Sequence, residues 1–167
     1  KTSSMGDILH TLPALHDARE AQPEVHFDWL IEQAYAPLVE KHPFIHQCIP
    51  IQLRSHKGNF LSYLRSPAYK ALRRKLKSTH YDFVIDAQSL LKSAWFTRLA
   101  QGERCGYSRA TCREPFASLA YQQKFDISLQ EHAITRTRQL FAQSLNYTYP
   151  DLPPTYHLKT TQSKYTS

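Results

Sequence analysis

The first eighteen residues read KTSSMGDILHTLPALHDA (Lys1–Ala18), and they decide how the rest of the chain is interpreted. Small hydroxyl residues, a glycine and a carboxylate stand ahead of an apolar repeat, which is typical of a turn that caps the N-terminus of a helix. Turns of this kind normally follow a strand, yet no strand stands in front of this one. We therefore expect that the first strand of the fold is missing from this sequence.

Pro13 divides the apolar repeat, because a proline inside a helix removes a hydrogen bond and clashes with the preceding turn. We expect a short helical turn over Asp7 to Thr11 and a helix that restarts at Pro13, which is an acceptable first-turn position. This helix should run to about Ala21 and stop before Pro23.

The chain has the size and composition of one globular domain. Its 167 residues include 41% hydrophobic and 12% aromatic residues, and a chain of this length can bury about two thirds of its unfolded surface. The cysteines Cys48, Cys105 and Cys112 lack the spacings of a disulfide framework or a zinc ribbon, which favours a reducing compartment. No apolar run approaches the roughly 20 residues that span a bilayer, and the first residues do not resemble a signal peptide. The sequence therefore indicates a cytoplasmic protein.

The net charge of +7 is unevenly distributed along the chain. No Asp or Glu occurs from Lys41 to Tyr81. The same window holds the basic residues Lys41, Arg54, Lys57, Arg65, Lys70, Arg73, Arg74, Lys75 and Lys77. Such a positive field suits nucleic acid, an anionic membrane face or a phosphorylated substrate. A solvated helix face that aids solubility explains the charges equally well.

Predicted strands and helices alternate along the chain. We expect strands at Val25–Glu32, at Gln47–Leu53 and, with buried character, at YDFVIDAQ (Tyr81–Gln88). We expect helices at Ala34–His42, at Asn59–Ser78 with an interruption near Pro67, at Ser89–Gly102 ending on the glycine, and at Glu131–Tyr147. This alternation predicts βαβ units and an α/β fold with a Rossmann-like, doubly wound parallel sheet.

The ligand crevice of a doubly wound sheet lies beyond the carboxyl ends of its strands. The loops after Glu32, Leu53 and Asp86 should therefore converge on one crevice. The opening loop should join them and bring the residues Ser3, Ser4, Gly6 and Asp7. These residues would lie at a helix N-terminus, where free backbone N–H groups attract anions. Without further information, a helix cap explains Asp7 better than catalysis does.

The histidines offer one pattern that is typical of metal ligands. His42 and His46 have the i, i+4 spacing that can hold zinc on one helix face. However, no third ligand stands at a telling distance, and the sequence contains no HExxH arrangement. We therefore expect no metal site, and no cofactor is predicted.

Four segments carry a resemblance to a known family. They are KTSSMGDILHTLPAL (Lys1–Leu15), YDFVIDAQSLLKSA (Tyr81–Ala94), REPFASLAY (Arg113–Tyr121) and EHAITRTRQLFAQSLNY (Glu131–Tyr147). In order and spacing they resemble the amino-terminal half of the bacterial lipopolysaccharide heptosyltransferase I family. The similarity to enzymes that add the second heptose is weaker.

The resemblance implies a two-domain, inverting GT-B glycosyltransferase without a metal. Residues 1–155 would form the Rossmann-like domain that holds the Kdo-lipid A acceptor, and residues 156–167 would begin a linker. ADP-heptose, the donor, would bind to a carboxyl-terminal domain outside this sequence, and this sequence contains no glycine fingerprint for nucleotide phosphates. The protein would be cytoplasmic and would lie peripherally on the anionic inner face of the cytoplasmic membrane.

The resemblance also implies roles for individual residues. Asp7 would be the catalytic base that takes the proton from the acceptor hydroxyl. Acceptor binding is implied for Lys1, Ser4, Gly6, Arg54, Lys57, Gln88, Lys92, Arg113 and His132. Guanidinium groups suit this task because they stay charged and can hold a carboxylate or phosphate with two parallel bonds. From the residues alone, a surface position suits Arg113, a helix cap suits His132, and Asp86 could instead hold its loop through backbone N–H groups.

A second class of function stays open, namely a non-catalytic basic α/β module that binds nucleic acid or lipid head groups. Phe60, Tyr63 and Tyr69 could stack on bases. The helix around Tyr69–Leu76 separates leucines from basic residues, a pattern that suits an anionic lipid surface or simple packing on the sheet. This alternative does not explain the SSMGD loop. We therefore expect a heptosyltransferase with no nucleic acid partner.

Overall fold

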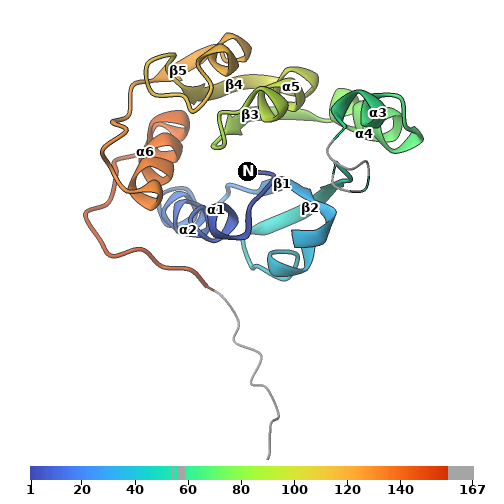
Figure 1. Ribbon diagram of the computed structural model, residues 1–167. Coiled ribbons are helices and arrows are strands. Elements are labelled where there is room, and N and C mark those ends of the chain that lie inside the picture. Colours follow the sequence, from blue (N-terminus) through green and yellow to red (C-terminus); the bar gives the residue numbers. More distant parts are fainter. Residues whose placement is uncertain (54, 56–58, 158–167) are drawn as a thin grey trace, which may run out of the picture.

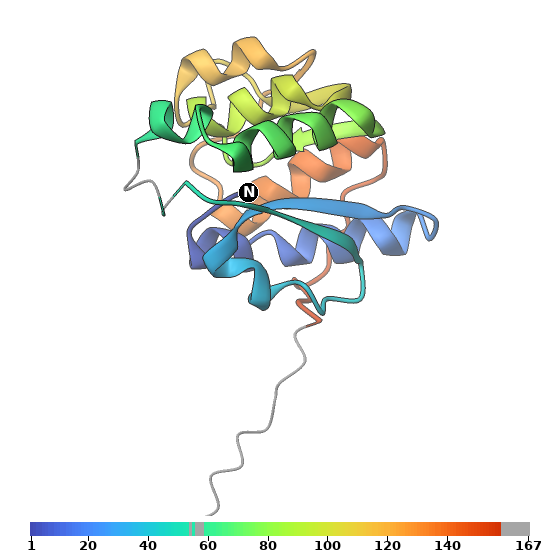
Figure 2. The same ribbon diagram turned by 90° about the vertical axis from the view of Figure 1, so that its right-hand side faces the viewer.

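The computed structural model describes residues 1–53, 55 and 59–157. Helices cover both faces of a central layer of parallel strands (Figure 1). Figure 2 shows the same layers from a second side. Two predicted acceptor-binding residues, Arg54 and Lys57, lie outside the described residues.

The strands form two separate parallel sheets. β1 (Phe27–Glu32) pairs with β2 (Ile45–Ile51) in a two-stranded sheet. β3 (His80–Asp86), β4 (Gln101–Tyr107) and β5 (Gln123–Phe125) form a three-stranded sheet in the order β3-β4-β5. The predicted parallel pairing is confirmed, but the sequence pattern did not indicate β4 or β5.

The helices are short, and several begin where the sequence places a proline or a small polar residue. Their bounds are α1 (Met5–Leu9), α2 (Leu12–Ala21), η1 (Gln33–Leu38), α3 (Phe60–Leu64), α4 (Pro67–Ser78), α5 (Leu91–Leu99), η3 (Pro115–Ala120) and α6 (Ala133–Leu145). The predicted breaks at Pro13 and Pro67 are confirmed, because both prolines lie in the first turn of a new helix. Within the described residues, no helix combines the length and the apolar character needed to cross a bilayer.

Two hydrophobic cores hold the layers together, and each takes residues from both sheets. In the first core, α1, α2 and α6 pack against Trp29 of β1 and Tyr107 of β4. In the second core, α3, α4 and α5 pack against Ile51 of β2, and Val84 of β3 lies at its margin. The two sheets therefore behave as one layer with an interruption.

The interruption is a groove of about 370 Å³ between β1 and β3. Consecutive residues of both strands line it, from Phe27 to Leu30 and from His80 to Ala87. Among the described strands, β1 pairs only with β2, and β3 pairs only with β4 and not with β1. Each strand therefore turns an open edge toward the groove.

Two contacts cross the groove at its opposite ends. At the amino ends of the strands, the Tyr81 hydroxyl donates a hydrogen bond to Asp28 Oδ2 at 3.1 Å. Beyond the carboxyl ends, the Thr2 amide donates to Gln88 Oε1 at 2.7 Å. The groove is thus closed at both ends by polar contacts.

Two local expectations from the sequence are wrong. The third strand was expected to be buried, but Phe83 is 40% exposed because β3 borders the groove. The helix expected to end on Gly102 ends at Leu99, and Gly102 belongs to β4 with a φ of 147°. A Cβ at Gly102 would collide with the carbonyl oxygen of Tyr81. This glycine therefore permits close strand packing, and it does not end a helix.

A buried ion pair joins α2 to α6. Arg138 Nε donates to Asp17 Oδ2 at 2.5 Å, and Arg138 Nη2 donates to Asp17 Oδ1 at 3.3 Å. The two side chains are only 5% and 4% exposed. Arg138 also donates to the Tyr149 hydroxyl and the Pro150 carbonyl, so it fastens the segment after α6.

We predict that Arg138→Met lowers the free energy of unfolding by about 3–5 kcal/mol, because it leaves the Asp17 carboxylate buried without its cation. Urea denaturation at pH 7, followed by circular dichroism, measures this loss. The double variant Asp17→Leu/Arg138→Met removes both charges and should recover most of the stability. A single variant as stable as the original chain would contradict the prediction.

Candidate active site

The carboxylate of Asp86, at the end of β3, organises the crevice. It is buried and accepts four hydrogen bonds. Oδ1 accepts from the backbone amides of Gln88 and Ser89 at 2.9 and 3.1 Å, and Oδ2 accepts from the hydroxyls of Ser93 and Tyr121 at 2.8 and 2.7 Å. Asp86 therefore holds its own loop through backbone N–H groups, and the structure supports this interpretation of the residue.

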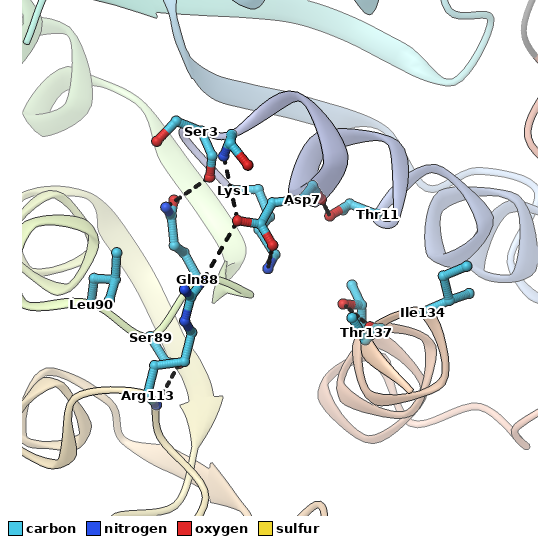
Figure 3. A network of polar contacts seen from close by, with 12 residues as sticks. Lys1, Ser3, Asp7, Thr11, Gln88, Ser89, Leu90, Arg113, Ile134 and Thr137 are labelled. Carbon is cyan, nitrogen blue, oxygen red and sulfur yellow. Dashed lines mark hydrogen bonds and ion pairs between the residues drawn. The ribbon is translucent and has the colours of Figure 1, made fainter. Parts of the chain in front are cut away.

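Gln88 then fastens the opening loop to the end of β3 (Figure 3). Its Oε1 accepts from the amide and the hydroxyl of Thr2, both at 2.7 Å, and its Nε2 donates to the Ser3 carbonyl at 2.8 Å. On the other side, the Glu32 amide at the end of β1 donates to the Thr2 carbonyl at 2.9 Å. The Leu53 amide donates to Glu32 Oε2 at 3.2 Å. The predicted convergence is confirmed for the opening loop and for the chain at Glu32, Leu53 and Gln88, whereas most of the loop after Leu53 lies outside the described residues.

Asp7 lies between two cations at the start of α1. Lys1 Nζ lies 3.3 Å from Asp7 Oδ1, and Arg113 Nη1 lies 3.5 Å from Asp7 Oδ2. The Ser4 amide also donates to Asp7 Oδ2, at 3.4 Å. The Lys1 side chain is 7% exposed, that of Asp7 is 25% exposed, and that of Arg113 is 51% exposed. The carboxylate is therefore open to one side, and Arg113 holds it from the solvent side.

The charges around Asp7 set its protonation. Burial raises the pKa of the Asp7 carboxyl, but Lys1, the Ser4 amide and Arg113 outweigh this effect, so the pKa lies below its ordinary value. Burial lowers the pKa of the Lys1 ammonium, and Asp7 opposes that change. Asp7 is therefore ionised at neutral pH, and the two cations make it a weaker base than an isolated carboxylate.

The loop that carries Arg113 is fastened to the loop after β3. The Arg113 amide donates to Ser89 Oγ at 3.1 Å, and the Glu114 amide donates to the Ser89 carbonyl at 3.1 Å. Glu114 Oε2 accepts from the Leu91 amide at the start of α5. The backbone at Arg113 is therefore fixed, whereas its half-exposed guanidinium reaches Asp7 across a long contact.

The other predicted site residues lie around this cluster. Ser4 and Gly6 are exposed at the start of α1. Apart from the adjacent residues and the backbone of α1 itself, no atom of the described residues lies within 4 Å of a Cβ placed on Gly6. Lys92 is exposed on α5. Among the described residues, no hydrogen bond or ion pair joins Lys92 or His132 to Asp7.

His132 caps α6, as the residues alone suggested. Its Nδ1 accepts a hydrogen bond from the Ile134 amide at 3.3 Å. Its ring packs edge-on against His10, which follows α1, with ring centroids 5.6 Å apart. The contact with His10 places the start of α6 beside the helix that carries Asp7.

The sequence did not indicate the residues that hold the loops of the site in place through hydrogen bonds. Tyr121 is one of them, because burial and the neighbouring Asp86 raise the pKa of its hydroxyl, which therefore stays a proton donor. Ser89 is another, with a left-handed φ of 54° that turns its side chain toward the Arg113 loop. The contacts of Ser89 with Arg113 and of Tyr121 with Asp86 join separate segments of the chain, so the sequence carried no local signal for these supporting roles.

The two histidines with zinc-like spacing engage separate partners. His42 Nε2 lies 3.1 Å from the Tyr156 carbonyl oxygen, and His46 Nδ1 lies 2.9 Å from Asp28 Oδ1. Across the part of the chain that the structure describes, no group of three or more His, Cys, Asp or Glu side chains is arranged to hold a metal ion.

Solved structures with the same arrangement define the class of protein. The chain superposes on Escherichia coli heptosyltransferase WaaC with ADP with a TM-score of 0.85 and 46% identity, over 95% of this chain and 49% of that one. A family 9 glycosyltransferase from Veillonella parvula shares the fold with a TM-score of 0.74 at 17% identity. The chain thus has the α/β fold of the amino-terminal half of a GT-B glycosyltransferase, and the predicted fold class is confirmed.

The chain belongs to glycosyltransferase family 9 (heptosyltransferase), whose model matches residues 69–167. Among curated relatives, lipopolysaccharide heptosyltransferase 1 of Pseudomonas aeruginosa is 43% identical over 95% of this chain and 45% of its own length. The protein of the same name from Escherichia coli K12 is 46% identical over 93% of this chain and 49% of its own length. The resemblance noted in the sequence is confirmed, and the chain spans about half the length of these relatives.

We predict that acid weakens the original chain more than it weakens the variant Asp7→Asn. The pKa of Asp7 is lower in the folded state than its ordinary value of 3.8. Its contribution to stability is therefore fully present above that value and is lost as the pH falls through the folded pKa. Urea denaturation of both chains at a series of pH values measures the difference in their free energies of unfolding. A difference that stays constant, or that grows as the pH falls, would count against the charge cluster.

Proposed function

We propose that this chain is the acceptor-binding half of a lipopolysaccharide heptosyltransferase that adds the first heptose. The donor would be ADP-heptose, and the acceptor would be the Kdo region of the lipid A-linked inner core. The observation that carries the proposal is the position of Asp7, an ionised carboxylate that lies between Lys1 and Arg113 at the carboxyl ends of the strands. The 46% identity to a structure described as heptosyltransferase WaaC with ADP-2-deoxy-2-fluoro heptose supports the choice of donor.

In this proposal Asp7 acts as the general base. The acceptor hydroxyl gives its proton to Asp7 as its oxygen forms a bond to the anomeric carbon of heptose. The bond from that carbon to the ADP oxygen breaks, and ADP leaves with the electron pair, so the configuration at the carbon is inverted. This step needs one carboxylate beside the attacking oxygen and no covalent intermediate.

Arg113 would strengthen Asp7 as a base when the acceptor binds. Its guanidinium is half-exposed and touches Asp7 only at 3.5 Å, so an acidic group of the acceptor can compete for it. A carboxylate or phosphate offers two parallel hydrogen bonds, which a guanidinium prefers to one long contact. Once Arg113 turns to the acceptor, Asp7 loses one of its two cations and its pKa rises.

The remaining predicted residues complete the acceptor site in this proposal. The open space above Gly6 leaves room for the acceptor to approach the start of α1. Arg54, Lys57, Lys92 and His132 stay predictions from the resemblance. The acceptor is a lipid, so the protein would act at the inner face of the cytoplasmic membrane.

The competing proposal of a nucleic-acid module loses the support that its aromatic residues gave. Two of the three aromatic side chains proposed to stack on bases are buried, because Tyr63 is 1% exposed and Tyr69 is 8% exposed. Both belong to the second hydrophobic core. Their rings are therefore occupied by packing within the protein.

We predict that Asp7→Asn lowers kcat of the whole enzyme about 10²- to 10⁴-fold and changes the KM for the acceptor only a few-fold, because the proton is removed in the transition state alone. A transfer assay followed by mass spectrometry gives both constants. Arg113→Ala should instead raise the KM for the acceptor. The rise should correspond to a loss of about 1–3 kcal/mol of binding free energy, because a charge-assisted bond is lost.

Two comparisons make these outcomes specific. Lys124→Ala, at an exposed position of β5, should change neither constant. A dephosphorylated acceptor should remove most of the Arg113→Ala effect if phosphate is the group bound there. If Asp7→Asn weakened acceptor binding as much as it lowered kcat, the role of Asp7 as a base would be refuted.

We also propose that residues 1–155 are the acceptor-binding domain and that a strand preceding Lys1 fills the groove between β1 and β3. The two open edges that line the groove support this, because a strand that pairs with both would join the sheets into one. The Thr2 carbonyl already accepts a hydrogen bond from the backbone amide of Glu32 at the end of β1 at 2.9 Å, so the opening loop lies against this edge.

An extension at Lys1 tests this proposal. A β-strand rises about 3.3 Å per residue, so six residues rich in valine and isoleucine match the length of β1. Fused to Lys1, they should raise the melting temperature and protect the amides of β1 and β3 from hydrogen exchange. The same extension with a central proline should do neither, because proline cannot donate to a sheet. Equal effects of the two extensions would refute the proposal.

A further inference from the structure

The helices α3, α4, α5 and η3 form a row over one side of the strands, and the row carries no acidic residue. η3 contacts α5, α5 contacts α4, and α4 contacts α3, so the row is continuous. Among the described residues, half of the exposed large hydrophobic side chains belong to it. They are Leu61, Leu91, Trp95, Phe116 and Leu119.

We propose that this row, which we call the docking face, binds an anionic lipid membrane. The proposal rests on the proposed function, because it specifies how an enzyme with a lipid acceptor would reach it. The docking face combines exposed apolar side chains, a fixed tryptophan and exposed cations, which together match the chemistry of a membrane interface.

The exposed side of α5 shows the pattern most clearly. Four exposed residues share one side of this helix, because three of them follow Leu91 at spacings of one, four and seven positions. They are Leu91, Lys92, Trp95 and Arg98. The opposite side packs inward through residues such as Phe96. The outward side of α5 is therefore apolar and cationic.

Trp95 is held half out of the protein. It is 44% exposed, yet its Nε1 donates to the Tyr69 hydroxyl at 3.1 Å and its ring packs edge-on against Phe60, with centroids 6.2 Å apart. An indole that keeps its polar atom satisfied and its ring partly exposed suits the boundary between head groups and acyl chains. Its fixed position also lowers the entropy cost of inserting it.

The short helix η3 extends this apolar surface beside α5. Phe116 is 65% exposed and Leu119 is 69% exposed. Residues three apart in a 3₁₀-helix lie on the same side, so these two side chains point outward together. The Arg109 guanidinium lies 5.7 Å from the centroid of the Phe116 ring and adds a cation at the margin.

Charge decides which partner fits the docking face. The exposed cations of α4 and α5 are Lys70, Arg73, Arg74, Lys77, Lys92 and Arg98. None of them takes part in a salt bridge among the described residues. A polyanion such as RNA would satisfy these charges but would leave the exposed leucines in water. An anionic bilayer accommodates both kinds of side chain.

The docking face begins where the candidate active site ends. The loop after Asp86 leads directly into α5, and Arg113 stands two residues before η3. An acceptor anchored in the bilayer under α5 and η3 would therefore hold its head group near Asp7. This arrangement links the two surfaces without any movement of the domain.

Flotation with lipid vesicles tests the proposal on this chain. We expect the chain to bind vesicles of phosphatidylcholine with about 30% phosphatidylglycerol and to bind pure phosphatidylcholine vesicles at least tenfold more weakly. Phe116→Ser/Leu119→Ser should weaken binding to the anionic vesicles at least tenfold. Leu129→Ser/Leu152→Ser removes two equally exposed leucines outside the docking face and should leave binding unchanged.

The charges are tested separately. Arg73→Gln/Arg74→Gln should weaken binding about 25-fold, since each cation near an anionic surface contributes roughly a fivefold effect. Lys41→Gln/Lys124→Gln, at exposed sites outside the docking face, is the matched control. If the two pairs weaken binding equally, the attraction is a property of net charge and the docking face is wrong.

Fluorescence locates the contact, because the chain has only two tryptophans and Trp29 is buried. Brominated lipids should quench Trp95 when the chain binds, and the Phe116→Ser/Leu119→Ser variant should lose this quenching. Binding without quenching, or tighter binding to RNA than to anionic vesicles, would overturn the proposal. Transfer to a delipidated acceptor should be unaffected by the same variant in the whole enzyme, which separates this proposal from the proposed function.

Discussion

The arrangement of the crevice depends on one buried carboxylate. Asp86 accepts hydrogen bonds from its own loop, from α5 through Ser93, and from the end of η3 through Tyr121. A buried carboxylate that lost these donors would be costly, so the three segments are held together by its need for them. Gln88 extends this constraint to the opening loop, and through it to the helix that carries Asp7.

The sequence predicted those parts of the fold that local physics decides. Proline cannot continue a helix, so Pro13 and Pro67 marked new helices before the structure did. The strand before Asp86 is apolar and β-branched, and it could be identified from composition. β4 could not, because QGERCGY is polar and contains two glycines. It forms a strand since β3 and β5 pair with it on both sides, and that pairing is a property of the tertiary structure.

The residues of the candidate site also divide into those that local sequence identifies and those that only the tertiary structure brings together. Lys1 and Asp7 are six residues apart, and the capping turn that brings them together is visible in the sequence. Arg113 is 106 residues from Asp7, and it was found only because the chain resembles a family. Ser89 and Tyr121 lie within segments that carry the resemblance, but neither the local pattern nor the resemblance assigned them a role, because their supporting contacts join different segments of the chain. Sequence reasoning therefore found the residues that face the crevice more readily than those that hold it in place.

The pairing of Asp17 with Arg138 has a consequence for how the chain folds during synthesis. The two residues are 121 positions apart, so Asp17 leaves the ribosome long before its partner exists. Until α6 is made, α2 has an ionised carboxylate on the side that must be buried, and the first core cannot close over β1. Contacts between distant parts of a chain also form slowly. The first core can consequently be completed only after α6 has been synthesised, because α1, α2 and β1 need the contacts that α6 supplies.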